Sequence, residues 1–172
     1  VITYAIVNFN ISFLLTLEGE VALNARPAAS VEERIGQIYS GTFLENMTGV
    51  YIRNDSAEIS GLISGSGFYH SRSGFIKTYV NSRPVEFGQI VRLLKRVYGE
   101  LLPPGKFPAA FLFINIDPAE IDVNVHPQKK EIRIREGNDF LNVLEGVIRR
   151  GIENRGALNL NRKLAPIIKK NE

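Results

Sequence analysis

A pair of lysines in a proline-containing segment is the part of this sequence best suited to chemistry. The segment covers residues 121–134 and places Lys129 and Lys130 two and three positions after Pro127. A lysine on a loop between two stiff strands can project its ammonium group away from its own domain toward an anion such as a phosphate. The same spacing also suits a solvated basic turn, because lysine at strand ends commonly prevents edge-to-edge pairing. Spacing alone favours the basic turn, so both interpretations stay open at this point.

Two short strands are expected to position this basic tip. Apolar and polar side chains alternate over residues 121–125 and again over residues 131–135. A period of two predicts a β-strand with one buried face on each side of the tip. Pro127 fixes φ and has no N–H group for a ladder, so the sheet must be interrupted there. The segment is therefore expected to form two strands around a presented loop.

His126 is the residue of this segment that could act as a general acid. It lies on the same strand face as Asp122 and Asn124, with no nucleophile placed near it, so we interpret it as a structural hydrogen-bonding residue. The chain has no cysteine and only one other histidine, His70, and it lacks the His-Glu-x-x-His spacing of a zinc site. Thiol nucleophiles and cysteine-based zinc sites are excluded, and we expect no metal site in this chain.

Length and charge bound the class of protein. The 172 residues suit one domain, given about 150 residues per domain. Lys and Arg number 21 against 18 Asp and Glu, a net charge of +3, which permits contact with nucleic acid without requiring it. The apolar start over residues 1–7 is interrupted by Asn8 and Asn10, so we expect neither an export signal nor a membrane span. We assign residues 1–155 to the domain and residues 156–172 to a tail or linker.

The remaining patterns predict a mixed α/β fold, in which a mixed sheet is covered by about three helices. Ser30 and Glu33 have the spacing of a capping box, which predicts a helix over residues 31–39. Residues 110–116 are almost entirely apolar, as in a central strand buried on both faces. Further strands are expected at 11–17, 21–23, 50–53, 57–63 and 75–80, and further helices at 86–101 and from 138 or 139 onward.

The predicted helix over residues 86–101 has an apolar side and a basic side. Its apolar residues recur at helical spacing and leave Arg92, Lys95 and Arg96 facing outward. One interpretation is a solvated helix face. The other is a set of non-specific contacts to DNA phosphates.

Two segments carry a resemblance to a known family. The segment from Asp122 to Arg133, DVNVHPQKKEIR, resembles the signature of the MutL family of DNA mismatch-repair proteins. The segment from Tyr79 to Val85, YVNSRPV, resembles that family's Phe-Val-Asn-Gly-Arg landmark, with Ser82 in place of the glycine. The motif residues interpreted as structural are Asp122, Asn124, His126, Pro127, Asn81 and Arg83.

The resemblance implies the second, or transducer, domain of the N-terminal GHKL ATPase region of such a protein. It implies a left-handed β-α-β fold shared with a ribosomal protein. It also implies that Lys129 reaches the γ-phosphate of ATP as a catalytic and nucleotide-binding residue, with Lys130 as the alternative. ATP and Mg²⁺ would be bound by the preceding domain, which this chain lacks. We therefore treat the chain as a fragment that alone neither binds ATP tightly nor hydrolyses it.

The resemblance also implies partners and a place in the cell. The partners would be DNA, a second MutL subunit that is either a copy or a paralogue, and a MutS-type mismatch-recognition protein. No membrane is expected, and the location would be the cytoplasm, in association with the nucleoid, or the nucleus of a eukaryote. Two other functions stay open: a stand-alone nucleic-acid-binding module of ribosomal-protein-like fold, and the transducer domain of a type II topoisomerase.

Overall fold

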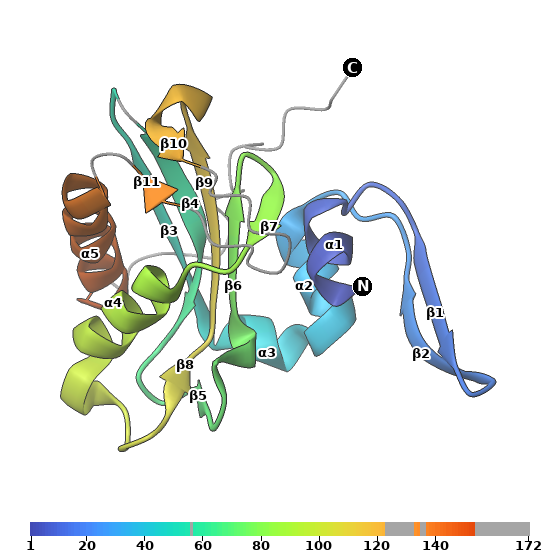
Figure 1. Ribbon diagram of the computed structural model, residues 1–172. Coiled ribbons are helices and arrows are strands. Elements are labelled where there is room, and N and C mark those ends of the chain that lie inside the picture. Colours follow the sequence, from blue (N-terminus) through green and yellow to red (C-terminus); the bar gives the residue numbers. More distant parts are fainter. Residues whose placement is uncertain (56, 123–132, 135–136, 154–172) are drawn as a thin grey trace.

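The centre of the molecule is a five-stranded mixed sheet with helices on both faces (Figure 1). The structure is a computed structural model that describes residues 1–55, 57–122, 133–134 and 137–153 of the chain. A mixed α/β fold is therefore confirmed. In spatial order the strands of the sheet are β3 (Met47–Arg53), β4 (Ala57–Ser64), β9 (Ala110–Ile116), β6 (Ile76–Val80) and β7 (Arg83–Val85).

Strand β9 is the central strand, and its bounds match the predicted range of 110–116. All of its residues except Asn115 are buried, because helices cover both faces of the sheet at this strand. It pairs antiparallel with β4, from Ala57 opposite Ile116 onward, and parallel with β6, from Ile76 opposite Ala110 onward. Apolar side chains on both faces are what such a position requires.

The parallel pair β6 and β9 is joined by a crossover that contains α4 (Gly88–Tyr98) and the 3₁₀ turn η2 (Gly99–Leu101). In Figure 1 both strands run upward, and the connection passes in front of the sheet as the chain moves leftward from β6 to β9. This arrangement makes the β-α-β unit left-handed. The crossover also carries β8 (Phe107–Pro108), which pairs with β5 (Tyr69–His70) ahead of the 3₁₀ turn η1 (Ser73–Phe75).

Each face of the sheet has its own layer of helices. Helices α4 and α5 (Gly137–Glu153) pack on one face over a mainly aliphatic core. Helices α1 (Ile2–Val7), α2 (Val31–Tyr39) and α3 (Gly41–Glu45) lie on the other face over a core rich in aromatic rings. The described residues thus form five α-helices rather than about three. Helix α3 was not predicted because its five residues are too few to show a periodic pattern.

The capping box at the start of α2 is present with one difference in detail. The Ser30 hydroxyl accepts a hydrogen bond from the Glu33 N–H at 3.2 Å. The Glu33 carboxylate reaches back to the Ala29 N–H at 2.8 Å, rather than to that of Ser30. The helix ends at Tyr39, because the next residue, Ser40, has a positive φ of 121°. Gly41 then begins the next helix.

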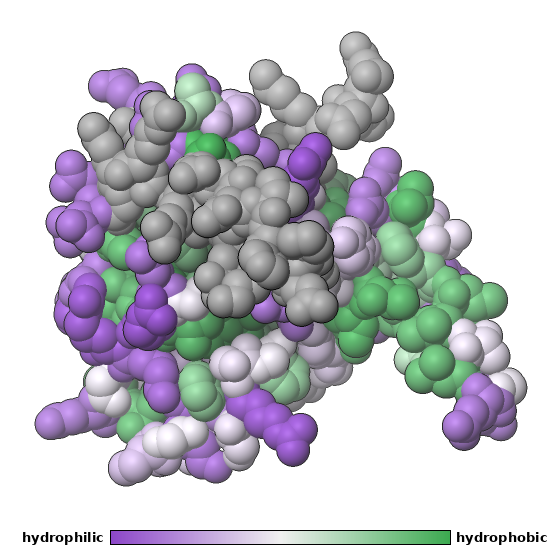
Figure 2. All heavy atoms as spheres, viewed as in Figure 1, coloured by the Kyte–Doolittle hydropathy of each residue, from purple (hydrophilic) through white to green (hydrophobic). Residues whose placement is uncertain are grey.

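A hairpin of β1 (Phe13–Leu17) and β2 (Glu20–Ala25) projects from the body of the molecule (Figure 1). One side of it packs on α1 and α2 through a small cluster that includes Leu23 and Ala25. The other side leaves Leu14 and Val21 exposed, and Figure 2 shows apolar atoms along this projection. The strands predicted at 11–17 and 21–23 are thus confirmed and pair as this hairpin.

Candidate functional site

The stem of the predicted motif hairpin leads out of the central strand. Strand β10 (Ile121–Asp122) pairs antiparallel with β11 (Arg133–Ile134), and the 3₁₀ turn η3 (Pro118–Glu120) connects β9 to it. The predicted pairing of the two strands is confirmed for these four residues, whereas the rest of both predicted strands lies outside the described residues. The predictions for Asn124, His126, Pro127, Lys129 and Lys130 fall within residues 123–132, which lie outside the described residues.

Asn81 ties the turn after β6 to the end of β9. Its backbone N–H donates to the Ile114 carbonyl at 2.9 Å. Its side-chain amide then donates to the Ile116 carbonyl at 2.9 Å and accepts from the Ile116 N–H at 3.0 Å. The amide thus mimics one further residue of the β6–β9 ladder. These bonds hold Ile116, the last residue of β9, just before the chain continues toward the motif segment.

The same turn places two consecutive residues in the left-handed region. Asn81 has φ of 47° and Ser82 has φ of 63°, between the paired residues Val80 and Arg83. Positive φ at both central residues is the type I′ geometry that suits the twist of a hairpin. Asparagine tolerates this conformation, whereas serine is less favoured there than glycine.

Strand β7, which follows this turn, was not expected. The sequence predicts a turn that leads directly into a helix at residue 86, but three residues first pair with β6 and the helix begins at Gly88. Arg83 consequently lies on an exposed edge strand rather than at a helix start. Three residues are too few for an alternating pattern to predict a strand.

The three basic residues of α4 face outward, as their helical spacing predicts. They do not form one cluster. The Lys95 ammonium lies 4.5 Å from the centre of the Phe107 ring, a cation–π contact on the β8 side of the helix. Arg96 turns toward α5, where its guanidinium lies 2.5 Å from the Glu145 carboxylate. Arg92 has no ion-pair partner among the described residues.

Glu145 is a residue of this surface that was not predicted. Its second oxygen accepts hydrogen bonds from Arg149 Nε at 2.9 Å and from Arg149 Nη2 at 2.7 Å. The hydrogen bonds from Arg149 and then Arg96 lower the pKa of the Glu145 carboxyl. The pair of Glu145 and Arg149 has the i,i+4 spacing that a sequence reveals. The link to Arg96 spans 49 residues and only the fold reveals it.

Arg34 is a buried cation that was also missed. It has no exposed surface, and its guanidinium donates to the carbonyls of Ala5, Phe9, Ile11 and Arg26 at 2.5–2.8 Å. Burial lowers its pKa. A charged residue on the apolar side of α2, next to Ile35, is the signal that could have revealed it. Its role is architectural, because it fixes α1 and the projecting hairpin to α2.

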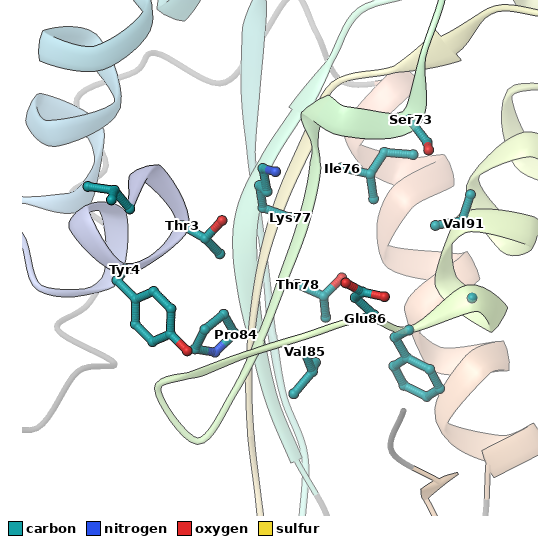
Figure 3. Close-up of a pocket in the computed structure, with 13 residues that line it drawn as sticks. Thr3, Tyr4, Ser73, Ile76, Lys77, Thr78, Pro84, Val85, Glu86 and Val91 are labelled. Carbon is teal, nitrogen blue, oxygen red and sulfur yellow. The ribbon is translucent and has the colours of Figure 1, made fainter. Parts of the chain in front are cut away.

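A groove at the sheet edge was not predicted either (Figure 3). It has a volume of about 540 Å³ and lies between the start of α1, the edge of β6 and β7, and the start of α4. Lys77 and Glu86 both line it, so their charges balance. Its walls come from three separate parts of the chain, which no local pattern brings together.

Among the described residues, no three histidine, aspartate or glutamate side chains gather as metal ligands would. No described helix is both long and apolar enough to cross a membrane.

The fold is similar to part of two solved structures of DNA-repair proteins. A structure titled as the N-terminal domain of a DNA repair protein superposes with a TM-score of 0.73 at 22% identity, covering 90% of this chain and 51% of that one. The ADP complex of the Aquifex aeolicus MutL ATPase domain superposes with a TM-score of 0.55 at 16% identity, covering 85% and 43%. These similarities concern the fold.

Sequence comparison then gives the family. Residues 35–153 match the family described as DNA mismatch repair protein, C-terminal domain. The MutL protein of Syntrophobacter fumaroxidans is 35% identical over 122 residues, and that of Haemophilus influenzae is 30% identical over 149 residues. These alignments cover 71% and 83% of this chain but only 18% and 23% of the relatives. The chain belongs to the MutL family of DNA mismatch-repair proteins, as its two motifs predict.

Proposed function

We propose that this chain is the transducer domain of a MutL-type ATPase and that it presents Lys129 to the γ-phosphate of ATP bound elsewhere in the protein. The observation that supports this proposal is the position of the β10–β11 stem. The stem continues from the central strand through η3, and Asn81 holds the strand end with two side-chain hydrogen bonds. The stem pairs Asp122 with Arg133, and Lys129 lies between these two residues in the sequence.

A lysine suits this role chemically. Hydrolysis of ATP builds negative charge on the γ-phosphoryl oxygens, and a preorganised cation stabilises that charge. An ammonium group makes a compact point contact, whereas a guanidinium would bind two oxygens. ATP and Mg²⁺ would be held by the preceding domain, so this chain by itself neither binds ATP tightly nor hydrolyses it. A contact between two domains would also couple nucleotide state to their relative orientation.

Steady-state ATP hydrolysis by the full-length protein tests this role. Lys129→Ala is expected to lower turnover by about a hundredfold, the usual effect of removing one charge-stabilising group. Lys130→Ala is the matched control, since it removes the same charge one residue later, and it should leave turnover near the wild-type value. Normal hydrolysis by both variants would contradict the proposal. The segment would then be interpreted as a solvated basic turn.

The second part of the proposal is non-specific DNA binding through Arg92, Lys95 and Arg96. Their exposure on α4 supports it. Charge reversal of the three residues is expected to weaken duplex binding and to flatten its dependence on salt concentration. An unchanged slope of affinity against salt would contradict it. We expect no preference for mismatched over matched duplex, because mismatch recognition would belong to a MutS-type partner.

The remaining parts of the proposal follow from membership of the family. The protein would act with a second MutL subunit, either a copy or a paralogue, and with a MutS-type protein. It would work where chromosomal DNA is, in the cytoplasm with the nucleoid or in the nucleus. Size-exclusion chromatography of the full-length protein with and without ATP tests the pairing, and a monomer under both conditions would contradict it.

A further inference from the structure

The seam between α4 and α5 joins two arginines through one carboxylate. Glu145 accepts from Arg96 on α4 at 2.5 Å and from Arg149 on α5 at 2.7 Å and 2.9 Å. The arginine side chains remain 64% and 51% exposed, whereas Glu145 is only 23% exposed. The carboxylate therefore lies beneath two guanidinium groups that still face solvent.

The charge on this seam is unbalanced. Arg92 lies one helical turn before Arg96, is exposed and has no ion-pair partner among the described residues. Three arginines thus accompany the one carboxylate of Glu145. Figure 2 shows hydrophilic side chains along the side of the molecule where Figure 1 places α4 and α5.

The guanidinium groups of the seam keep unused hydrogen-bond donors. Each guanidinium has five N–H donors. Arg96 gives one of them to Glu145 and Arg149 gives two. The remaining donors are not used by Glu145, and both arginine side chains are more than half exposed. Phosphate diesters match this donor geometry because guanidinium binds two phosphate oxygens at once.

The scaffold beneath the seam is rigid. Helix α5 packs so closely on the sheet that a side chain at Gly151 would meet Val50 at 2.5 Å. Helix α4 buries Ile90, Leu94 and Val97 in the same core. The spacing of the arginines is therefore set by the packing of both helices.

We infer that the α4–α5 seam is the main phosphate-binding surface of this domain, that Arg149 contacts the DNA backbone together with Arg92 and Arg96, and that Glu145 competes with phosphate for their guanidinium groups. This inference rests on the proposed DNA binding and extends it to a second helix. Lys95, which lies over Phe107 on the other side of α4, contributes less than these arginines.

Salt-dependent duplex binding by the full-length protein tests the seam. The variants are Arg149→Gln, Glu145→Gln and Arg92→Gln, with Arg26→Gln as the matched control, because Arg26 is an exposed arginine beside the projecting hairpin. Arg149→Gln leaves Glu145 paired with Arg96, and the glutamine in Glu145→Gln can still accept a hydrogen bond. Circular dichroism and a thermal melt of each variant verify that it is folded.

Opposite effects are expected from the two partners in the seam. Arg149→Gln should weaken duplex binding about fivefold and reduce the slope of log affinity against log salt by about 0.9, the value for one lost phosphate contact. Glu145→Gln should strengthen binding about threefold without reducing the slope, because it frees two guanidiniums from a competing anion. Arg26→Gln should bind as the wild type does.

Two outcomes would overturn the inference, and they are distinguishable from failure of the proposed function. Unchanged binding by Arg149→Gln alongside weakened binding by Arg92→Gln would confine the DNA contact to α4. Weaker or unchanged binding by Glu145→Gln would make Glu145 a structural clamp between the helices rather than a competitor. Unchanged binding by all four variants would instead contradict the proposed DNA binding itself.

Discussion

The two faces of the central sheet handle charge in opposite ways. On the face covered by α4 and α5, the core is mainly aliphatic and the charged groups Arg96, Glu145 and Arg149 lie on the outer surface of the helices. On the face covered by α1, α2 and α3, Arg34 is completely buried and bonded only to backbone carbonyls. The outer charged groups remain accessible to a partner. The buried guanidinium of Arg34 instead donates to backbone carbonyls and so links separate segments of the chain.

Tyr79 on this second face also binds an internal partner. The Tyr79 hydroxyl donates to the Thr3 carbonyl of α1 at 3.0 Å, and burial raises its pKa. Its ring stacks on Phe113 at 4.8 Å between centroids. Tyr79 and Arg34 therefore anchor α1 at the carbonyls of Thr3 and Ala5.

The largest expected effect in this comparison is that of Arg34→Met. The change leaves four carbonyl groups without their buried donor and should lower the free energy of unfolding by at least about 3 kcal/mol. Hydrogen exchange should rise first in the β1–β2 hairpin, which Arg34 attaches to α2. Urea denaturation with amide exchange measures both effects.

Arg72→Met is the control for that experiment. Arg72 is exposed, and surface changes of this kind usually stay within about 0.5 kcal/mol. If Arg34→Met unfolded at the same urea concentration as the wild type, the apolar contacts of Leu23 and Ala25 would be enough to hold the hairpin, and the contrast between the faces would fail.

On the other face, two glycines of α5 should respond in opposite directions. A Cβ at Gly151 would lie 2.5 Å from Val50 Cγ1 and 2.9 Å from Ile63 Cδ1, so Gly151→Ala should cost about 2 kcal/mol through overpacking. A Cβ at Gly146 would meet nothing within 4 Å, so Gly146→Ala should gain about 1 kcal/mol of helix propensity. Chemical denaturation compares the two, and equal effects would show that α5 does not pack as tightly as described.

A smaller gain is expected at the turn after β6, a strand whose side chains contribute to both faces. Ser82→Gly removes the cost of a positive φ and should raise the free energy of unfolding by about 1 kcal/mol or less. Because β6 serves both faces, hydrogen exchange should slow equally in α2 and α4. Ser66→Gly, in an exposed loop, is a control for the flexibility that glycine adds. Destabilisation by Ser82→Gly would mean that the serine side chain stabilises the turn.

The smallest expected effect is a difference between the two faces in how their contribution to stability depends on pH. His70 stacks on Phe75 at 3.7 Å and its Nε2 has no partner among the described residues; burial lowers its pKa from 6.5. The unfolded chain therefore takes up a proton first as pH falls below 6.5, and stability declines there. The hydrogen bonds from Arg149 and Arg96 lower the pKa of Glu145 from 4.5, so its contribution is lost only as pH falls below 4.5.

Urea titrations across this range with two variants separate the contributions. His70→Phe should flatten the decline just below pH 6.5, and Glu145→Gln should flatten the decline below pH 4.5. The reverse assignment of variants to pH ranges would contradict the comparison.

Much of the fold follows from local sequence patterns. Strand β9 and helix α2 have the bounds that their apolar run and capping box predict. Strand β7 and helix α3, with three and five residues, were missed, because a period of 2 or 3.6 residues needs a longer segment to be recognised. The pairing of β9 with both β4 and β6 depends on contacts between residues far apart in the sequence. A pattern within one segment therefore cannot predict this pairing.

The candidate site was predictable only in part for the same reason. The motif hairpin and the outward basic face of α4 are visible in the sequence as alternation and as helical spacing. The clamp of Asn81 on Ile116 and the bridge from Arg96 to Glu145 join residues 35 and 49 positions apart. Such contacts exist only after the strands and helices have packed.

The central position of β9 also orders the assembly of the chain during synthesis. Strands β3 and β4 form one hairpin and β6 and β7 another, and in the described sheet only β9 connects the two. The ribosome releases β9 after all four of them, because it begins at residue 110. Until then each hairpin has an open edge that is prone to pair with other chains. The nascent domain is thus most exposed to aggregation during the interval before its last central strand emerges.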